Sequence, residues 1–165
     1  MQQMDIWTGY LDNTGTPCLK IRISGPLSKG EEFEAIIDTG FTGFLAMPLL
    51  KAFPLGLILY GTTEVTLADG SASPKLTAKA GVTVTGGDLK IGVAVLEPTS
   101  TDILVGMDFL QKFERVLFVH TGDPDGVMLM ARKDFDELRT QRAAKKAKGS
   151  KRKVTTLPAP PATSK

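Results

Sequence analysis

One aspartate in the sequence stands where a carboxylate could do chemistry. Asp38 follows the apolar run 35–37 and precedes Thr39 and Gly40. An ionised carboxylate at the end of a buried strand is costly unless it is hydrogen-bonded or shares a proton. Gly40 lets its backbone N–H approach the carboxylate closely, and the Thr39 hydroxyl can lock the loop. The same residue types also form ordinary turns, so the tripeptide alone does not decide between a catalytic aspartate and a turn.

Two later segments bear on that choice. The apolar residues 103–105 are followed by Gly106 and then by a short helical pattern. Between the two motifs, the segment Glu64–Ser71 alternates polar and apolar residues and contains Asp69-Gly70, a typical hairpin turn. The order along the chain is therefore a carboxylate motif, a hairpin, and a glycine motif that leads into a helix.

These three features in this order resemble the retropepsin-like aspartic proteases. The resemblance covers roughly Ile6–Met130, and the stretch Asp38–Pro48 is similar to prokaryotic single-domain members. It implies an aspartic endopeptidase in which two carboxylates face each other and share one proton, because both cannot ionise at close range. The ionised carboxylate would activate a water, and the protonated one would polarise the scissile carbonyl. It implies no metal and no cofactor.

The resemblance also implies a role for each residue of the motifs. This chain contains one Asp-Thr-Gly, and the similar segment His120-Thr121-Gly122 has histidine in place of aspartate. Because the family's mechanism needs two carboxylates, the active site would need a homodimer. Thr39 would make hydrogen bonds across the dimer, and the hairpin would close over a peptide or protein substrate as a flap. The implied roles are catalytic for Asp38, Thr39 and Gly40, substrate-binding for Phe41, Thr42, Ala68, Asp69, Gly70 and Ser71, and structural for Ile103, Leu104, Val105 and Gly106.

Two positions depart from the better-known members of that family. Phe41 stands where pepsin-like and retroviral members usually carry Ala or Ser, and Met107 stands where retroviral members carry Arg. The departures leave open a second hypothesis, a retropepsin-like peptide-binding or dimerisation module without proteolysis.

The composition excludes several other classes of protein. The chain has 165 residues, which suits one domain with a short appendage. Its one cysteine and one histidine exclude a disulfide framework, a cysteine-based zinc cluster and a histidine-rich metal site. No apolar run approaches the roughly 18 residues of a membrane span. Residues 1–10 lack the basic and apolar parts of a secretory signal, so we expect a cytoplasmic protein that does not contact membranes.

The net charge of +2 conceals an uneven distribution. Residues 139–165 hold nine basic and no acidic side chains, so the remaining 138 residues carry a net charge of −7. We expect a protease-like domain over 1–133, a short basic helix over 134–148 with acids in its first turn, and a disordered basic, proline-rich tail over 149–165. The tail could contact nucleic acid or an acidic partner weakly, or it could be merely solvated.

Short apolar segments separated by turn signals predict the fold class. We expect an all-β protein, a closed acid-protease (retropepsin-like) barrel with one or two short helices, followed by the basic helix and the tail. The strands are expected over Met4–Tyr10, Cys18–Ser24, Phe33–Asp38, Thr63–Ala68, Leu76–Val84, Leu89–Val95, Ile103–Val105, Val116–Val119 and Val127–Met130, and the helices over Met47–Phe53 and Met107–Phe113.

Overall fold

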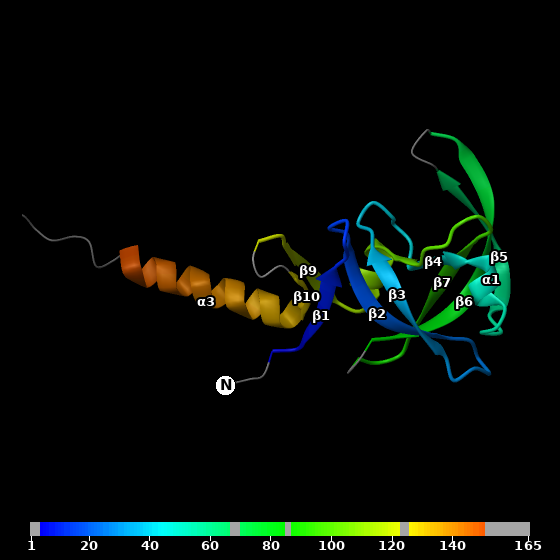
Figure 1. Ribbon diagram of the computed structural model, residues 1–165. Helices are drawn as coiled ribbons and strands as arrows, with labels where there is room; N and C mark the ends of the chain where they lie inside the picture. Colours follow the sequence, from blue (N-terminus) through cyan, green and yellow to red (C-terminus); the bar gives the residue numbers. More distant parts are fainter. Residues whose placement is uncertain (1–3, 67–69, 85–86, 123–125, 151–165) are drawn as a thin grey trace, which may run out of the picture. The chain divides into compact units, whose positions relative to one another are not determined.

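The computed structural model describes residues 4–66, 70–84, 87–122 and 126–150 (Figure 1). The chain divides into two compact units, residues 1–132 and 133–165. The described part of the second unit is residues 133–150, all of which belong to helix α3 (Arg132–Ser150). The sequence predicts a helix over 134–148. The observed helix extends two residues further, so Gly149 and Ser150 belong to it and not to the tail. Residues 151–165, which hold the rest of the predicted disordered tail, lie outside the described residues.

Strands dominate the first unit, as the predicted all-β class requires. None of the helices in the described ranges has both the length and the apolar character that a membrane span needs. The strands are β1 (Ile6–Leu11), β2 (Pro17–Ser24), β3 (Glu31–Ile37), β4 (Leu45–Pro48), β5 (Ile58–Thr66), β6 (Ala72–Thr83), β7 (Lys90–Glu97), β8 (Leu104–Val105), β9 (Arg115–His120) and β10 (Gly126–Ala131), and the short helices are α1 (Leu49–Ala52) and α2 (Met107–Lys112).

Six of the strands pair in a continuous circuit. Their order is β6-β7-β4-β8-β3-β2, and β2 pairs again with β6 through Ile23 and Val82. The sheet continues beyond the circuit through β1, β10 and β9 on one side and through β5 on the other. The predicted all-β class is thus confirmed, while the closure of the sheet into a barrel stays a prediction, and the remaining strands extend from the circuit.

Alternating side chains along the strands build the core. On β2, Ile21 and Ile23 are buried while Lys20 and Arg22 are exposed, as expected for a strand with one face on the core. On β6, Ala78, Ala80 and Val82 are also buried, and Val82 lies opposite Ile23. Aromatic rings fill the part of the core next to α2, where Phe109 and Phe113 lie 4.7 Å apart between ring centroids.

The sequence prediction is wrong for the segment before α1. The sequence pattern predicts a helix over Met47–Phe53, but Met47 and Pro48 belong to strand β4 and the helix α1 covers only residues 49–52. All four residues of β4 are buried, and the strand is parallel to β7 and antiparallel to β8. A short, wholly apolar run suits a buried strand as well as a buried helix, so only the long-range pairing decides its structure.

The topology around β8 places the end of β3 next to the glycine motif. Strand β8 lies between β3 and β4, parallel to the first and antiparallel to the second. Ile37 is in register with Val105, so Asp38 and Gly106 leave the sheet side by side. Two motifs that are far apart in the sequence are thereby brought to one edge.

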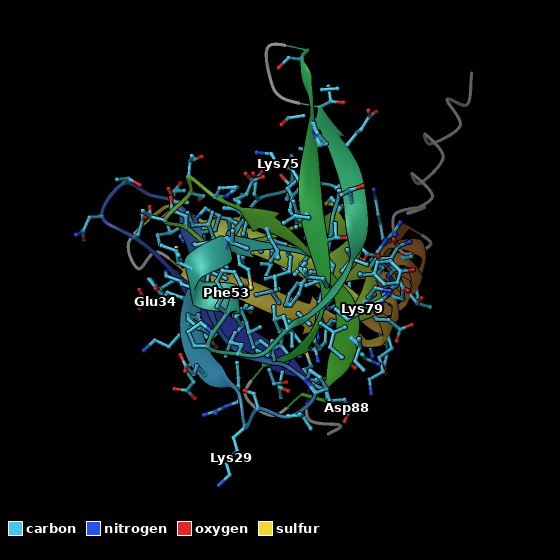
Figure 2. The ribbon with its side chains drawn as sticks, turned by 90° about the vertical axis from the view of Figure 1, so that its right-hand side faces the viewer. Lys29, Glu34, Phe53, Lys75, Lys79 and Asp88 are labelled. Carbon is cyan, nitrogen blue, oxygen red and sulfur yellow. The ribbon has the colours of Figure 1, made fainter. Side chains whose placement is uncertain are left out.

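Strands β5 and β6 form the predicted hairpin. Its pairing runs from Ile58 opposite Lys79 to Thr66 opposite Ala72, with a bulge between Leu59 and Gly61. The hairpin projects from the first unit, and its free end lies toward the same end of the view as the arrowhead of β3 (Figure 1). Figure 2 shows it standing clear of the other strands, with Lys75 above Lys79. Part of the predicted turn, residues 67–69, lies outside the described residues.

One buried arginine ties the start of the chain to β9. The Arg115 guanidinium lies 3.8 Å from the ring centroid of Trp7, and its Nη1 and Nη2 atoms donate to the Asp5 backbone oxygen at 3.0 Å and carboxylate at 2.7 Å. The Arg115 side chain is only 7% exposed. Its planar fork makes all three contacts at once.

We predict that Arg115→Lys lowers the free energy of unfolding by about 2 kcal/mol, because an ammonium keeps the charge but cannot stack and bridge in this geometry. Arg22→Lys is the matched control, since Arg22 and Glu32 form an exposed pair at 3.4 Å and its cost should stay within about 0.5 kcal/mol. Urea unfolding measures both values. Equal losses in the two variants would contradict this role of Arg115.

Candidate active site

Asp38 is held by its backbone at the end of a parallel pair of strands. The N–H of Ile36 donates to the Ile103 oxygen at 2.8 Å, and the N–H of Asp38 donates to the Val105 oxygen at 3.0 Å. The Phe41 N–H then donates to the Asp38 oxygen at 3.2 Å and closes a turn. These bonds fix the position from which the carboxylate projects.

The carboxylate itself is fixed by the turn that follows it. The Gly40 N–H donates to Asp38 Oδ1 at 2.8 Å. A Cβ at position 40 would lie 3.1 Å from the same oxygen, tighter than most such contacts, which explains the value of glycine there. Asp38 is half-buried, while Thr39 and Gly40 are exposed. The chain therefore presents a backbone-oriented carboxylate at its surface.

The start of helix α2 locks the rest of the loop. The first N–H groups of a helix have no partner within the helix, and here they bind the loop carbonyls. The Met107 N–H donates to the Phe41 oxygen at 2.8 Å, and the Asp108 N–H donates to the Thr42 oxygen at 3.2 Å. The loop after Asp38 is thus hydrogen-bonded to the segment after the glycine motif.

Two glycines allow this close approach. A Cβ at Gly106 would collide with the backbone oxygen of Phe41 and would lie 2.5 Å from that of Gly43. A Cβ on Gly43 would in turn collide with the Phe41 ring. Phe41 accordingly packs over both glycines and is half-buried. The resemblance implies a substrate-binding role for Phe41 and none for Gly43, although a glycine two residues after a large aromatic residue is a signal of such packing.

The structure brings most of the predicted site residues together. Residues 38–42 lie against the structural motif Ile103–Gly106, as the hydrogen bonds above show. The described flap candidates, Gly70 and Ser71, are exposed on the hairpin, and their substrate-binding role stays a prediction. Ala68 and Asp69 lie outside the described residues.

The single cysteine and the single histidine lie on different strands of the described part of the chain. Cys18 is buried on β2, and burial raises the pKa of its thiol, which disfavours the nucleophilic thiolate. His120 ends β9, and the strand order β2-β1-β10-β9 puts it about 14 Å from Cys18 at the usual strand spacing. Within the described ranges, no three His, Cys, Asp or Glu side chains are grouped to hold a metal ion.

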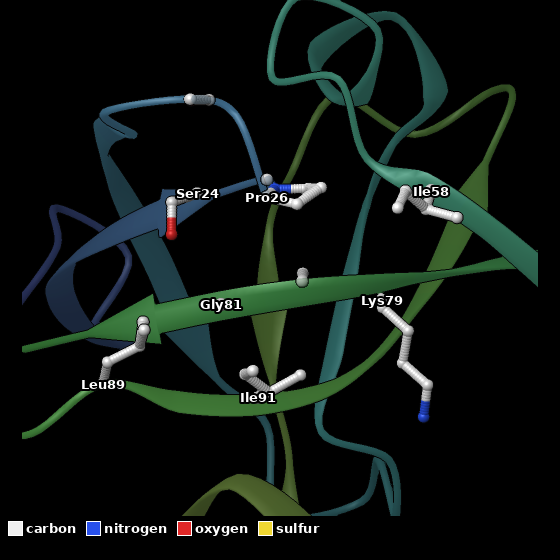
Figure 3. A pocket seen from close by; sticks show the side chains of 10 residues that line it. Ser24, Pro26, Ile58, Lys79, Gly81, Leu89 and Ile91 are labelled. Carbon is white, nitrogen blue, oxygen red and sulfur yellow. The ribbon is translucent and has the colours of Figure 1, made fainter.

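Two hollows lie elsewhere on the first unit, and Asp38 lines neither. One, of about 350 Å³, lies over β6 and β7, where Gly81 leaves space between Ile58, Leu89 and Ile91 (Figure 3). The other, of about 460 Å³, is more polar and includes Tyr10, Glu34 and Lys51. Burial, followed by a hydrogen bond to Glu34 and the charge of its carboxylate, raises the pKa of Tyr10 from 10.0 to about 12.

Comparison with known proteins bears on the fold. No protein-family model matches the sequence, and no curated protein sequence does. The structure is similar to the crystal structure of a retropepsin-like aspartic protease from Rickettsia conorii, with a TM-score of 0.54 and 14% identity. The match covers 79% of this chain and 96% of that chain. The fold is retropepsin-like. At this level of identity the likeness establishes the fold alone.

The close approach at Gly106 predicts a large effect of a single methyl group. In a retropepsin-like fold with this loop, Gly106→Ala should lower the free energy of unfolding by about 3 kcal/mol, because the added carbon meets two backbone oxygens that cannot turn away. Gly126→Ala is the matched control, since a Cβ there meets nothing within 4 Å, and it should change stability by less than about 0.5 kcal/mol. Thermal or urea unfolding compares the two, and similar losses would contradict the packing described above.

The raised pKa of Tyr10 predicts a late alkaline titration. The chain has two tyrosines, so Tyr60→Phe leaves Tyr10 as the only phenol, and its absorbance change should centre near pH 12 instead of 10.0. Because the folded protein holds this proton more tightly than the unfolded chain, the associated stability is complete below pH 10 and is lost as the pH rises toward 12. A midpoint at 10 in the folded variant would show that Tyr10 is not packed against Glu34.

Proposed function

We propose that this protein is an aspartic endopeptidase that acts as a homodimer on peptide or protein substrates. The observation that carries the proposal is the carboxylate of Asp38, held by the Gly40 N–H at the end of β3 within a retropepsin-like fold. The backbone bonds of Asp38 to β8 and of its loop to α2 fix the place from which this carboxylate projects at the surface.

The need for two chains follows from the chemistry. Acid–base hydrolysis of this kind uses two carboxylates that share one proton, and the sequence contains one Asp-Thr-Gly. A second Asp38 across a twofold axis would complete the pair. Thr39 is exposed in the single chain, which suits a hydroxyl that bonds across such an axis.

The proposed reaction needs no covalent intermediate. The ionised Asp38 of the pair removes a proton from a water, which attacks the scissile carbonyl, while the protonated Asp38 donates its hydrogen bond to the carbonyl oxygen. A proton then passes to the leaving amine as the tetrahedral intermediate collapses. The backbone bond from Gly40 keeps the carboxylate oriented through both steps.

The projecting hairpin is the proposed flap. Strands β5 and β6 pair only with each other over residues 62–66 and 72–75, so this part can move without breaking the circuit of strands. Closure over a peptide would exclude bulk water and strengthen the electrostatic interactions in the site.

We predict that Asp38→Asn lowers peptide turnover about a thousandfold, because an amide cannot act as a general base. Asp88→Asn is the matched control, since Asp88 is exposed and takes no part in the site, and it should keep full turnover. Cleavage of a mixed peptide library at acidic to neutral pH measures both, with dimer content matched by light scattering.

Two outcomes would contradict the proposal. The first is turnover that persists unchanged in Asp38→Asn. The second is a folded wild-type dimer that binds peptides without cleaving them, which would support the alternative of a peptide-binding or dimerisation module. Contact of the basic tail with nucleic acid rests on charge alone and stays a prediction.

A further inference from the structure

The hairpin leaves the sheet at a definite position. Strand β6 pairs with β7 from Val82 opposite Lys90 to Leu76 opposite Leu96. Its pairing with β5 continues four residues further, to Ala72. Toward the free end of the hairpin, the β6 pairing with β7 stops at Leu76. Lys75, which precedes Leu76 in the chain, belongs to the two-stranded part.

An ion pair bridges this boundary. Lys75 Nζ lies 2.8 Å from Glu97 Oε2, and the two side chains are only 17% and 22% exposed. Glu97 is the last residue of β7, so the bond joins the first residue of the free hairpin to the end of the neighbouring strand. By comparison, the distance between Arg22 Nη2 and Glu32 Oε1 is 3.4 Å, and these two side chains are 46% and 74% exposed.

Most of the described residues on the β5 side of the free part of the hairpin face water. A two-stranded ribbon alone is at best marginally stable in water, and residues 62–64 and Thr66 of β5 are exposed. Pro74, next to Lys75, has no N–H and cannot donate a further hydrogen bond. A mostly covered ion pair is screened less than a surface pair, so Lys75–Glu97 should hold the base of the ribbon more firmly than an exposed pair would.

Glu97 is connected along the chain to the strands that hold Asp38. Glu97 leads through residues 98–102 into Ile103, whose oxygen accepts the hydrogen bond of Ile36. Lys51 Nζ donates to the Thr101 oxygen at 3.1 Å and fixes the connecting loop to α1. Glu97 is thus continuous along the chain with β8, and the bond from the Asp38 N–H to the Val105 oxygen of β8 fixes the position of the carboxylate.

We propose that the Lys75–Glu97 ion pair is the hinge clamp of the β5–β6 hairpin and sets how readily the hairpin opens. The two side chains are positioning residues, since they act through the hairpin and do not touch the reacting atoms. The consequence for catalysis rests on the proposed function, in which the hairpin covers the substrate. The clamp itself does not depend on proteolysis.

Hydrogen exchange of the full-length protein tests the clamp. Glu97→Gln keeps the shape of the side chain and removes its charge. The amides of residues 62–66 and of Ala72, Ser73 and Lys75 should then exchange about fivefold faster, while those of β2 and β3 keep their wild-type rates. Glu32→Gln is the matched control, because it removes the charge of the exposed pair on β3, and it should leave hairpin exchange unchanged.

A reversed pair separates the clamp from general loss of stability. Lys75→Glu combined with Glu97→Lys restores opposite charges at the hinge and should return hairpin exchange to within about twofold of the wild-type rate. Hairpin exchange at the wild-type rate in Glu97→Gln would overturn the proposal. Faster exchange of β2 and β3 to the same extent would also overturn it, since the pair would then stabilise the whole unit.

Peptide cleavage provides the readout that links the clamp to function. With the clamp broken, KM should rise about fivefold while kcat changes less than about twofold, because a looser flap weakens substrate binding without altering the carboxylates. Should the wild type show no turnover, the proposed function fails, and the exchange measurements still decide whether the clamp exists. Faster hairpin exchange with unchanged KM would overturn the role of the clamp in substrate binding.

Discussion

The site depends on the insertion of β8 between β3 and β4. This arrangement supplies the Val105 oxygen that binds the Asp38 N–H, and it places Gly106 where the loop after Asp38 must pass. Parallel pairing between β3 and β8 needs a long connection, and that connection contains the hairpin and β7. The carboxylate, the loop and the candidate flap are therefore parts of one topological unit.

The hydrogen bonds around the loop leave the carboxylate ready for a partner. The first N–H groups of α2 are used by the oxygens of Phe41 and Thr42, so the helix start stabilises the loop and not the acid. Asp38 receives one backbone N–H, from Gly40. The single chain thus holds an oriented carboxylate, and the proposed function would add a second Asp38 to form the proton-sharing pair.

Local patterns in the sequence predicted the strands on either side of the site and the short helix α2. They could not predict β4, because its four buried residues suit a helix or a strand equally. They also missed the first half of β5, whose apolar residues Ile58 and Leu59 do not alternate. The contact of Phe41 with Gly43 and Gly106 arises only when segments distant in the sequence meet, so residue types alone pointed to a substrate contact there.

The chemistry of the hinge suits a segment that must both close and open. Separating two apolar side chains costs free energy in proportion to the apolar area that it exposes to water. A hinge made of buried apolar side chains would therefore favour the closed hairpin strongly. Lys75 and Glu97 are mostly covered when paired, yet each charge regains its hydration when the pair separates, and the net cost of opening stays small. In the proposed function, the direction of the bond would fix where the hairpin closes, and its modest strength would let a peptide enter.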